Sequence, residues 1–324
     1  MRFGDTLGGV LDLSTRHAQP GVHGETGLSA IQAAALLSVA GPRVAVQGSY
    51  RRGWLDLVLP PDPAFVGLPR WQDYHFQVTL SLQGGELEWL VFGSRDSLVA
   101  KGGPGSSDSR FDSTFDASGF HWRSGPGDWR VELRGSADRS DVAVDLGPDL
   151  TLRRQPYAFS AALEAERKAG DAHAIDLGAQ WKQTNTLLQG DFARLPVELG
   201  SGVDFSSLSH TAIDALGRKG VSSLWAQDRW QLLPTAAMSL GVRFDQVDIS
   251  SEFHFSPRWS LELGPFDHTV LRAAIGDYFQ SPSDLETVPG WSPIAARSSL
   301  VRNYTVGLQQ GLGRAELRLE AYHK

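Results

Sequence analysis

The chain has 324 residues, a net charge of −7 at pH 7, slightly polar mean hydropathy and no cysteine. Its mild acidity and scattered basic residues argue against nucleic-acid binding, which requires clustered Lys and Arg. No apolar run reaches the roughly 18 residues that a membrane helix needs, and the nearest candidate, Ile31–Ala40, is short and contains Ser38. A bundle of membrane helices is therefore excluded, whereas a membrane protein built of strands is not.

Strand-length segments in which apolar and polar residues alternate run from about Gly24 to Lys324. Successive side chains of a strand point to opposite faces, so each such segment has one apolar and one polar face. The apolar positions in chain order include His173, Ile175, Leu177, Ala179 and Trp181, then Leu224, Ala226, Trp230 and Leu232, then Met238, Leu240, Val242 and Phe244, and finally Ala315, Leu317, Leu319 and Ala321. Helical spacing of apolar residues is nearly absent. The pattern predicts an all-β protein with about 14 strands of roughly 10 residues or more.

Short and long connections alternate between these segments. The short ones are rich in turn residues and comprise Gln83–Gly85, Gly125–Asp128, Ala169–Asp171, Leu233–Thr235, Gly264–Asp267 and Gly311–Gly313. The long ones comprise Ser94–Arg110, Ala137–Asp149, Leu188–Lys219 and Gln280–Ser298. Alternation places the long connections on one rim, which predicts an antiparallel up-and-down transmembrane β-barrel of the outer-membrane type. Counting strands back to the start leaves one strand misassigned between Gly24 and Leu82.

Aromatic residues are frequent for so polar a chain, with ten tryptophans and six tyrosines. Those near predicted strand ends are Trp71, Trp129, Trp230, Tyr278 and Tyr322. Girdles of Trp and Tyr mark the two interfaces of membrane proteins, and core aromatics of a soluble β-protein are the alternative. The alternation of loop lengths favours the girdle.

Recognisable catalytic motifs are not found in the sequence: it has no Gly-x-Ser-x-Gly elbow, no phosphate-binding loop and no His-Glu-x-x-His. His17 and His23 are the closest histidine pair, but a solvated loop is the favoured interpretation over a metal site. Asp108, Asp112 and Asp116 lack the glycine and glutamate that complete a calcium loop. We therefore predict no enzymatic activity, no cofactor and no metal site.

The residues Phe3–Arg16 contain Gly-Gly-Val-x-Asp-x-x-Thr-Arg, which resembles the end of the plug domain of TonB-dependent outer-membrane receptors. Further segments resemble barrel motifs of that family and follow the family's order: Ser49–Asp56, Trp225–Trp230 with Leu240–Asp245, Ser256–Arg258, Arg272–Pro282 and Tyr304–Leu308. The positions that match the family signature are Gly8, Gly9, Asp12, Thr15, Arg16, Asp228, Trp230, Gly241, Arg243, Asp245, Pro257, Arg258, Gly276 and Pro282. Together the motifs cover nearly the whole chain.

The resemblance implies that residues 1–23 are the end of a plug domain with its linker and that residues 24–324 are a partial receptor barrel. Barrels of this family have about 22 strands around a plugged lumen, so a fragment with roughly the first two thirds of a barrel, and therefore an open sheet, is expected. The implied partners are outer-membrane lipid, an unknown small solute and a TonB-type energy-coupling protein, which would bind an amino-terminal segment that this chain lacks. The implied location is the cell outer membrane.

Three functions from different classes stay open at this point. The first is energised uptake of a scarce solute such as a siderophore, cobalamin, a saccharide, an oligopeptide or a metal complex. The second is an outer-membrane surface or assembly barrel that transports nothing. The third is a soluble all-β glycosidase with Asp228 and Glu262 as its acid/base pair, but the sequence shows no 40 to 50 residue repeat of the kind that a propeller would have.

Overall fold

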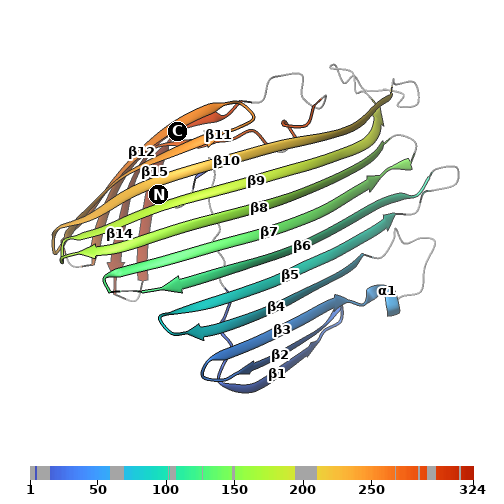
Figure 1. The fold of residues 1–324 in the computed structure, drawn as a ribbon, viewed down its shortest axis with the longest axis horizontal. Coiled ribbons are helices and arrows are strands. Elements are labelled where there is room, and N and C mark those ends of the chain that lie inside the picture. The colour runs from blue at the N-terminus through green and yellow to red at the C-terminus, as the bar shows by residue number, and fades with distance from the viewer. Residues whose placement is uncertain are drawn as a thin grey trace.

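A single antiparallel sheet of 15 strands, paired in sequence order, makes up nearly all of the described chain (Figure 1). The computed structural model describes residues 4–5, 15–58, 69–100, 102, 107–125, 127–147, 150–193, 210–266, 268–283, 285–289, 297–313 and 315–324. The strands are β1 (Gly21–Leu28), β2 (Gln32–Ala40), β3 (Val44–Gly53), β4 (Arg70–Leu82), β5 (Gly85–Ala100), β6 (Ser109–Ser124), β7 (Trp129–Asp145), β8 (Leu150–Ala169), β9 (His173–Ala193), β10 (His210–Leu233), β11 (Ala236–Val247), β12 (Glu252–Phe266), β13 (Thr269–Gln280), β14 (Ser299–Leu312) and β15 (Ala315–His323).

The sheet is strongly curved and open (Figure 1). Within the described part of the chain, no pairing joins β1 to β15, so each of these strands has one neighbour only. The predicted all-β, outer-membrane type of sheet, open in this chain, is thereby confirmed. One short helix, α1 (Leu55–Val58), precedes β4. None of the described helices has the length and apolar character needed to cross a membrane.

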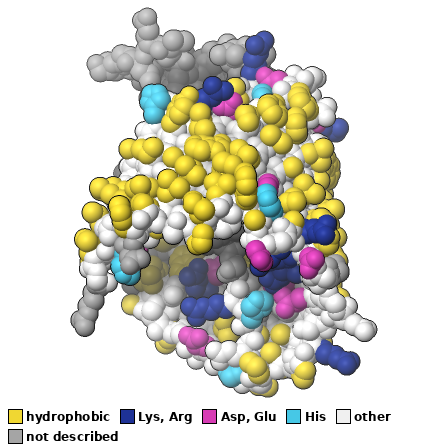
Figure 2. Space-filling view, turned by 90° about the vertical axis from the view of Figure 1, so that its left-hand side faces the viewer, with side chains coloured by type: hydrophobic (Ala, Val, Ile, Leu, Met, Phe, Trp, Pro, Cys, Tyr) yellow, Lys and Arg dark blue, Asp and Glu magenta, His cyan; other side chains and the backbone are white. Residues whose placement is uncertain are grey.

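The two faces of the sheet differ in chemistry as the alternation predicts. On the convex face, Leu240 is 50% exposed, and its cross-strand partner Trp259 lies beside it. On the concave face, Asp245 of the same strand is 0% exposed. Figure 2 shows hydrophobic side chains gathered over one part of the surface and charged side chains in a hollow below them. An apolar outer face and a polar inner face are typical of a barrel that spans a membrane.

The connections at one edge of the sheet, named here the short-turn rim, are tight. They use glycines with positive φ, at 90° for Gly84, 68° for Gly170 and 69° for Gly313, a conformation that glycine adopts without steric cost. The opposite edge, named the long-loop rim, carries the connections that follow β5, β7, β9 and β13. The predicted alternation of turn types is therefore present.

The strands extend further into the predicted loops than the sequence indicates. β5 continues to Ala100, β7 and β8 leave only residues 146–149 between them, and β9 and β10 pair from Ala193 to His210 onward. The predicted loops Ser94–Arg110, Ala137–Asp149 and Leu188–Lys219 were therefore too long. These strand ends break the alternation, with polar runs such as Ser94–Ser97 and Asp138–Asp141 or with adjacent apolar residues such as Leu187 and Leu188, so a two-residue period could not reveal them.

The strand count was also too low by one, at about 14 against the 15 observed. Four strands, β1 to β4, lie between Gly21 and Leu82. With four strands in this region, the chain enters β1 at the short-turn rim. This resolves the misassignment noted between Gly24 and Leu82. The short connection of residues 29–31 on the long-loop rim concealed the boundary between β1 and β2.

Candidate functional site on the concave face

A buried ion pair lies at the centre of the concave face of β10 and β11. Arg243 is 1% exposed, and its Nε donates to both carboxylate oxygens of Asp245, at 2.9 and 3.1 Å. The hydroxyl of Ser223 donates to the same carboxylate at 2.5 Å. The guanidinium lies 5.1 Å from the centre of the Trp225 ring. Charges buried this deeply persist only when paired and hydrogen-bonded, as these are.

Two glycines make room for a second arginine next to this pair. Arg258 of β12 lies directly between Gly241 of β11 and Gly276 of β13 in the register of the sheet. Its guanidinium stacks on Tyr278 at 4.2 Å. A Cβ on Gly276 would lie 3.0 Å from both the Arg258 side chain and the Tyr278 ring. The glycines therefore allow Arg258 to lie along the wall instead of projecting from it.

The segment that precedes β1 contacts this concave wall at two separate places. Gly4 lies on the guanidinium of Arg243, so close that a Cβ at this position would overlap it. The backbone N of Ser281 donates to the carboxylate of Asp5 at 2.6 Å. Farther along the chain, the carbonyl oxygen of Arg16 accepts a hydrogen bond of 3.0 Å from Gln47 on β3. The N-terminal residues are thus docked inside the curve of the sheet.

A hollow of about 840 Å³ opens on the concave face between these contacts. Its walls come from β5 to β10, and His17 of the N-terminal segment also lines it. Most charged side chains here are paired across strands: Arg123 with Glu86 at 2.6 Å, His121 with Glu132 at 3.1 Å, and Arg134 with Glu164. Figure 2 shows basic and acidic side chains within such a hollow. This wall carries paired charges beside apolar side chains such as Leu90, Phe92 and Phe115.

On the long-loop rim, the connection that follows β13 folds inward over the concave wall. Lys219 of β10 donates to the carbonyl oxygen of Pro282 at 2.8 Å. Gly217 faces this connection, because a Cβ there would lie 2.6 Å from the hydroxyl of Thr287. Val221, Val247 and Phe279 form a buried apolar cluster beneath it. The connection therefore narrows the concave space at this rim.

Glu252, the first residue of β12, anchors the far end of the same connection. Its carboxylate accepts from the hydroxyl of Ser298 at 2.6 Å, from the backbone N of Ser298 at 3.0 Å and from the hydroxyl of Ser250 at 2.8 Å. These hydrogen bonds, with that from the Ser298 hydroxyl the strongest, lower the pKa of Glu252 from 4.5 to about 2. A carboxylate with several donors is stabilised in its charged form.

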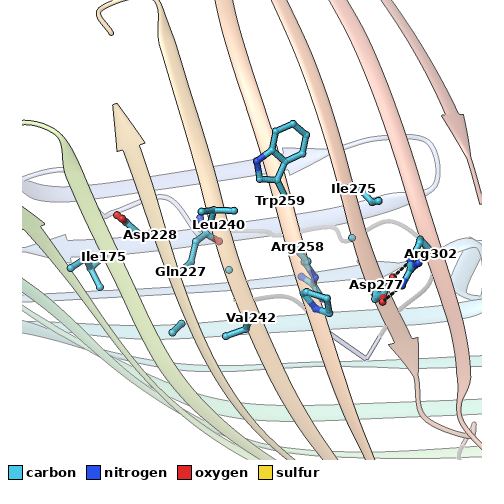
Figure 3. A pocket seen from close by; sticks show the side chains of 14 residues that line it. Ile175, Gln227, Asp228, Leu240, Val242, Arg258, Trp259, Ile275, Asp277 and Arg302 are labelled. Carbon is cyan, nitrogen blue, oxygen red and sulfur yellow. Dashed lines mark hydrogen bonds and ion pairs between the residues drawn. The ribbon is translucent and has the colours of Figure 1, made fainter. Parts of the chain in front are cut away.

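The convex face carries a shallow apolar groove of about 570 Å³ across β9 to β14 (Figure 3). Leu240, Trp259 and Ile275 line it, and the ion pair between Asp277 and Arg302, with a nitrogen to oxygen distance of 2.6 Å, lies at its edge. An apolar groove of this kind on an outward face suits a lipid environment more than a polar ligand.

The fourteen signature positions are divided among different surfaces. Gly8, Gly9 and Asp12 lie outside the described residues, whereas Thr15 and Arg16 lie in the N-terminal segment. Gly241, Arg243, Asp245, Arg258 and Gly276 come together on the concave face. Asp228, Trp230 and Pro257 lie on the convex face, and Pro282 lies in the connection after β13. The signature positions thus include the buried pair of β11 but not its partners from β10, Ser223 and Trp225, although Trp225 begins one of the motifs.

Asp228 and Glu262 lie on opposite faces of the sheet. Asp228 shares the convex face with Trp230 and accepts from His173 at 2.8 Å, while His173 stacks on Trp230 at 5.5 Å. Glu262 lies on the concave side, paired with Arg272 at 3.0 Å. Two carboxylates on opposite faces cannot flank one glycosidic bond. The glycosidase alternative based on this pair is therefore wrong.

The other candidate polar groups also have separate partners. His23 contacts the carbonyl oxygen of Pro20 at 2.8 Å, away from His17. Asp108 accepts from the backbone N of Gly102, Asp112 pairs with Arg110, and Asp116 accepts from the Tyr74 hydroxyl. Each of these three aspartates therefore has a partner of its own, and they do not form a common ion site.

Two of the predicted girdle aromatics are on the wrong face for that role. Trp71 packs on Gly53 with Arg51 5.2 Å from its ring, on the concave side. Tyr278 stacks on Arg258, also on the concave side. Trp230 is 41% exposed on the convex face, as the girdle requires. Position near a strand end does not define the face, because neighbouring residues alternate between faces.

The chain was compared with known families and structures. Residues 41–324 match the family model described as TonB dependent receptor-like, beta-barrel. No curated protein matched in the corresponding search. Among solved structures, the ferric yersiniabactin uptake receptor FyuA of Yersinia pestis aligns with a TM-score of 0.71 and 14% identity over 94% of this chain and 55% of that one.

Two further receptors are similar in structure. The siderophore receptor PirA of Acinetobacter baumannii aligns with a TM-score of 0.69 and 10% identity, over 95% of this chain and 53% of that one. The ferric enterobactin receptor PfeA of Pseudomonas aeruginosa aligns with a TM-score of 0.66 and 12% identity, over 95% and 54%. The chain spans about half the length of these structures. At such identities the structural likeness shows the fold, and the family match shows membership: the chain belongs to the TonB-dependent receptor-like β-barrel family.

Proposed function

We propose that this chain is part of an outer-membrane receptor that takes up a scarce solute with energy delivered by a TonB-type protein. The observation that carries this proposal is the docking of the N-terminal segment on the concave wall, where Gly4 lies on Arg243 and Asp5 accepts from Ser281. The described residues that precede β1 lie inside the curve of the sheet and pair with none of its strands, which suits a segment that is displaced. The family consists of outer-membrane receptors, which agrees with this arrangement.

The proposed division of the chain is residues 1–23 as the end of a plug with its linker and residues 24–324 as barrel wall. The hydrogen bond between Arg16 and Gln47 supports a linker that passes along the wall before β1. The first paired residue is Gly21, opposite Ala40, so the proposed boundary lies within β1. The TonB-type protein would act on a plug that continues toward the amino terminus.

The proposed surroundings are outer-membrane lipid on the convex face and solute on the concave face. Leu224, Leu240 and Phe255 are 62%, 50% and 51% exposed on the convex side. Exposing such apolar side chains has a low free-energy cost only where they face the hydrocarbon of a membrane. Paired charges line the concave hollow. A polar solute on the concave side would meet these charges.

A ferric siderophore or a similar metal complex is the solute class that we propose. The support comes from the names of the similar structures, which describe a ferric yersiniabactin receptor, a ferric enterobactin receptor and a siderophore receptor. The loops that would select among such ligands vary independently of the barrel. Cobalamin, saccharides and oligopeptides are therefore tested alongside.

Uptake by cells that carry the complete receptor tests the proposal. Cells would be given a panel of iron-55 siderophore complexes together with labelled cobalamin, saccharides and oligopeptides. Each would be tested with and without a protonophore that removes the energy of the inner membrane. Accumulation that the protonophore abolishes, with surface binding retained, is the expected result. Binding without any energised accumulation, for every ligand of the panel, would instead support a surface barrel that transports nothing.

A further inference from the structure

Three potential metal ligands from distant parts of the chain meet near the short-turn rim. His17 belongs to the N-terminal segment, whereas Glu86 and Glu88 belong to β5. One ligand atom from each lies within 4.8 Å of the others. Glu86 and Glu88 are two residues apart on one strand, so both carboxylates face the concave side. His17 is thus grouped with two glutamates of β5, whereas the sequence had pointed to His23 as its nearest histidine.

Among the described residues, one arginine forms the ion pairs of both carboxylates. Arg123 lies 2.6 Å from Glu86 and 3.8 Å from Glu88, so one guanidinium serves both. His121, the cross-strand partner of Glu88, instead contacts Glu132 at 3.1 Å. Two carboxylates this close to one another repel. A cation held between Glu86 and Glu88 would remove this repulsion.

Space and anchoring for an ion are also present. His17 and Glu88 both line the concave hollow of about 840 Å³, which leaves room for water ligands. The backbone next to His17 is held on the wall, because the carbonyl oxygen of Arg16 accepts from Gln47 at 3.0 Å. The His17 side chain is exposed, and those of Glu86 and Glu88 are 34% and 16% exposed. Small side-chain rotations can therefore bring the ligand atoms together.

We propose that His17, Glu86 and Glu88 bind one divalent transition-metal ion of the zinc type. One imidazole nitrogen and two carboxylate oxygens, with water in the remaining position, form a ligand set that zinc accepts at bonds of about 2.0–2.2 Å. Calcium and magnesium prefer oxygen ligands alone, so the histidine selects against them.

The bound ion would join the N-terminal segment to β5. It would add a third attachment of this segment to the wall, beside those of Asp5 and Arg16. Metal binding would then strengthen the docking of the segment that the proposed uptake mechanism displaces. The existence of the site does not depend on that mechanism, because it rests on the three side chains alone.

Titration of the folded, metal-free receptor in detergent with zinc chloride tests the site. Calorimetry should show one zinc ion per chain, and His17→Ala and Glu88→Gln should each weaken binding by roughly tenfold or more. His23→Ala is the matched control from the same segment and should bind as the parent does. Cobalt(II) in place of zinc should give a visible absorption spectrum that changes in His17→Ala.

A variant with the opposite expected effect makes the test sharper. Arg123→Gln removes the competing cation and should tighten zinc binding, while heat-modifiable migration on gels checks that each variant is folded. Unchanged zinc binding in His17→Ala, or an equal loss in His23→Ala, would overturn the proposal. Calcium binding as tight as zinc, and unaffected by His17→Ala, would also overturn it, since it would show a site made of carboxylates only.

Discussion

Gly4 lies flat against the guanidinium of Arg243, so the N-terminal segment and the concave wall meet without a side chain between them. Arg243 cannot move aside, because Asp245 and the ring of Trp225 hold it. We expect Gly4→Val to displace the segment from the wall at a cost of about 1–3 kcal/mol. Faster trypsin cleavage at Arg16 in the folded receptor would report this displacement.

Gly27→Val is the control for that experiment, because a Cβ on Gly27 meets no atom within 4 Å. Its cleavage rate at Arg16 should equal that of the parent. Equal rates for Gly4→Val and the parent would contradict the docking of the segment on Arg243.

The buried pair of Arg243 and Asp245 should behave as a unit. Arg243→Met leaves a carboxylate that is 0% exposed without its main counter-ion, and losses of about 3–5 kcal/mol are usual for such a change. Arg243→Met combined with Asp245→Leu removes both charges and should cost less than Arg243→Met alone. Urea unfolding in detergent micelles measures both values, and additive losses would show that the two groups are not coupled.

If the convex face contacts lipid, a charged side chain should cost much more folding free energy there than on the concave face. Leu240→Arg places a charge on the convex face and should reduce folding stability by about 2–4 kcal/mol in a bilayer. Ser260→Arg projects into the concave side, between Ser239 and Ala274, and should cost far less. Folding titrations in lipid vesicles give the two numbers, and similar costs would be incompatible with a lipid-facing convex surface.

The pKa of Glu252, lowered to about 2, makes the long-loop rim sensitive to acid. A carboxyl group with a lowered pKa stabilises the folded state at pH values above its ordinary pKa of 4.5. That stabilisation is lost as the pH falls from 4.5 toward about 2. Glu252→Gln should therefore lower the melting temperature at pH 6 and lose most of this deficit near pH 2.

Glu25→Gln, a change at an exposed residue of β1, is the matched control for that measurement. It should have little effect on the melting temperature at either pH. A deficit of Glu252→Gln that stays constant from pH 6 to pH 2 would show that the hydrogen bonds of Ser298 do not depend on the charge of Glu252.

The class of fold, the strand directions and the chemistry of each face follow from local patterns in the sequence. The alternation in Met238–Phe244 correctly assigned Leu240 to one face and Arg243 to the other, because a two-residue period is a local property of the strand. Turn glycines such as Gly84 and Gly170 located the short-turn rim for the same local reason. Where the alternation was broken, as by the adjacent Leu187 and Leu188 of β9, this signal was missing.

Only the tertiary structure decided which residues meet across the sheet. Register placed Arg258 between Gly241 and Gly276 and separated Asp228 from Glu262 onto opposite faces. The curvature of the sheet brought Gly4 to Arg243, and it brought His17 to Glu86, far away in the chain. A shift of register by one residue would exchange the faces. Such contacts depend on how many strands are paired and in what register, which no local pattern in the sequence records.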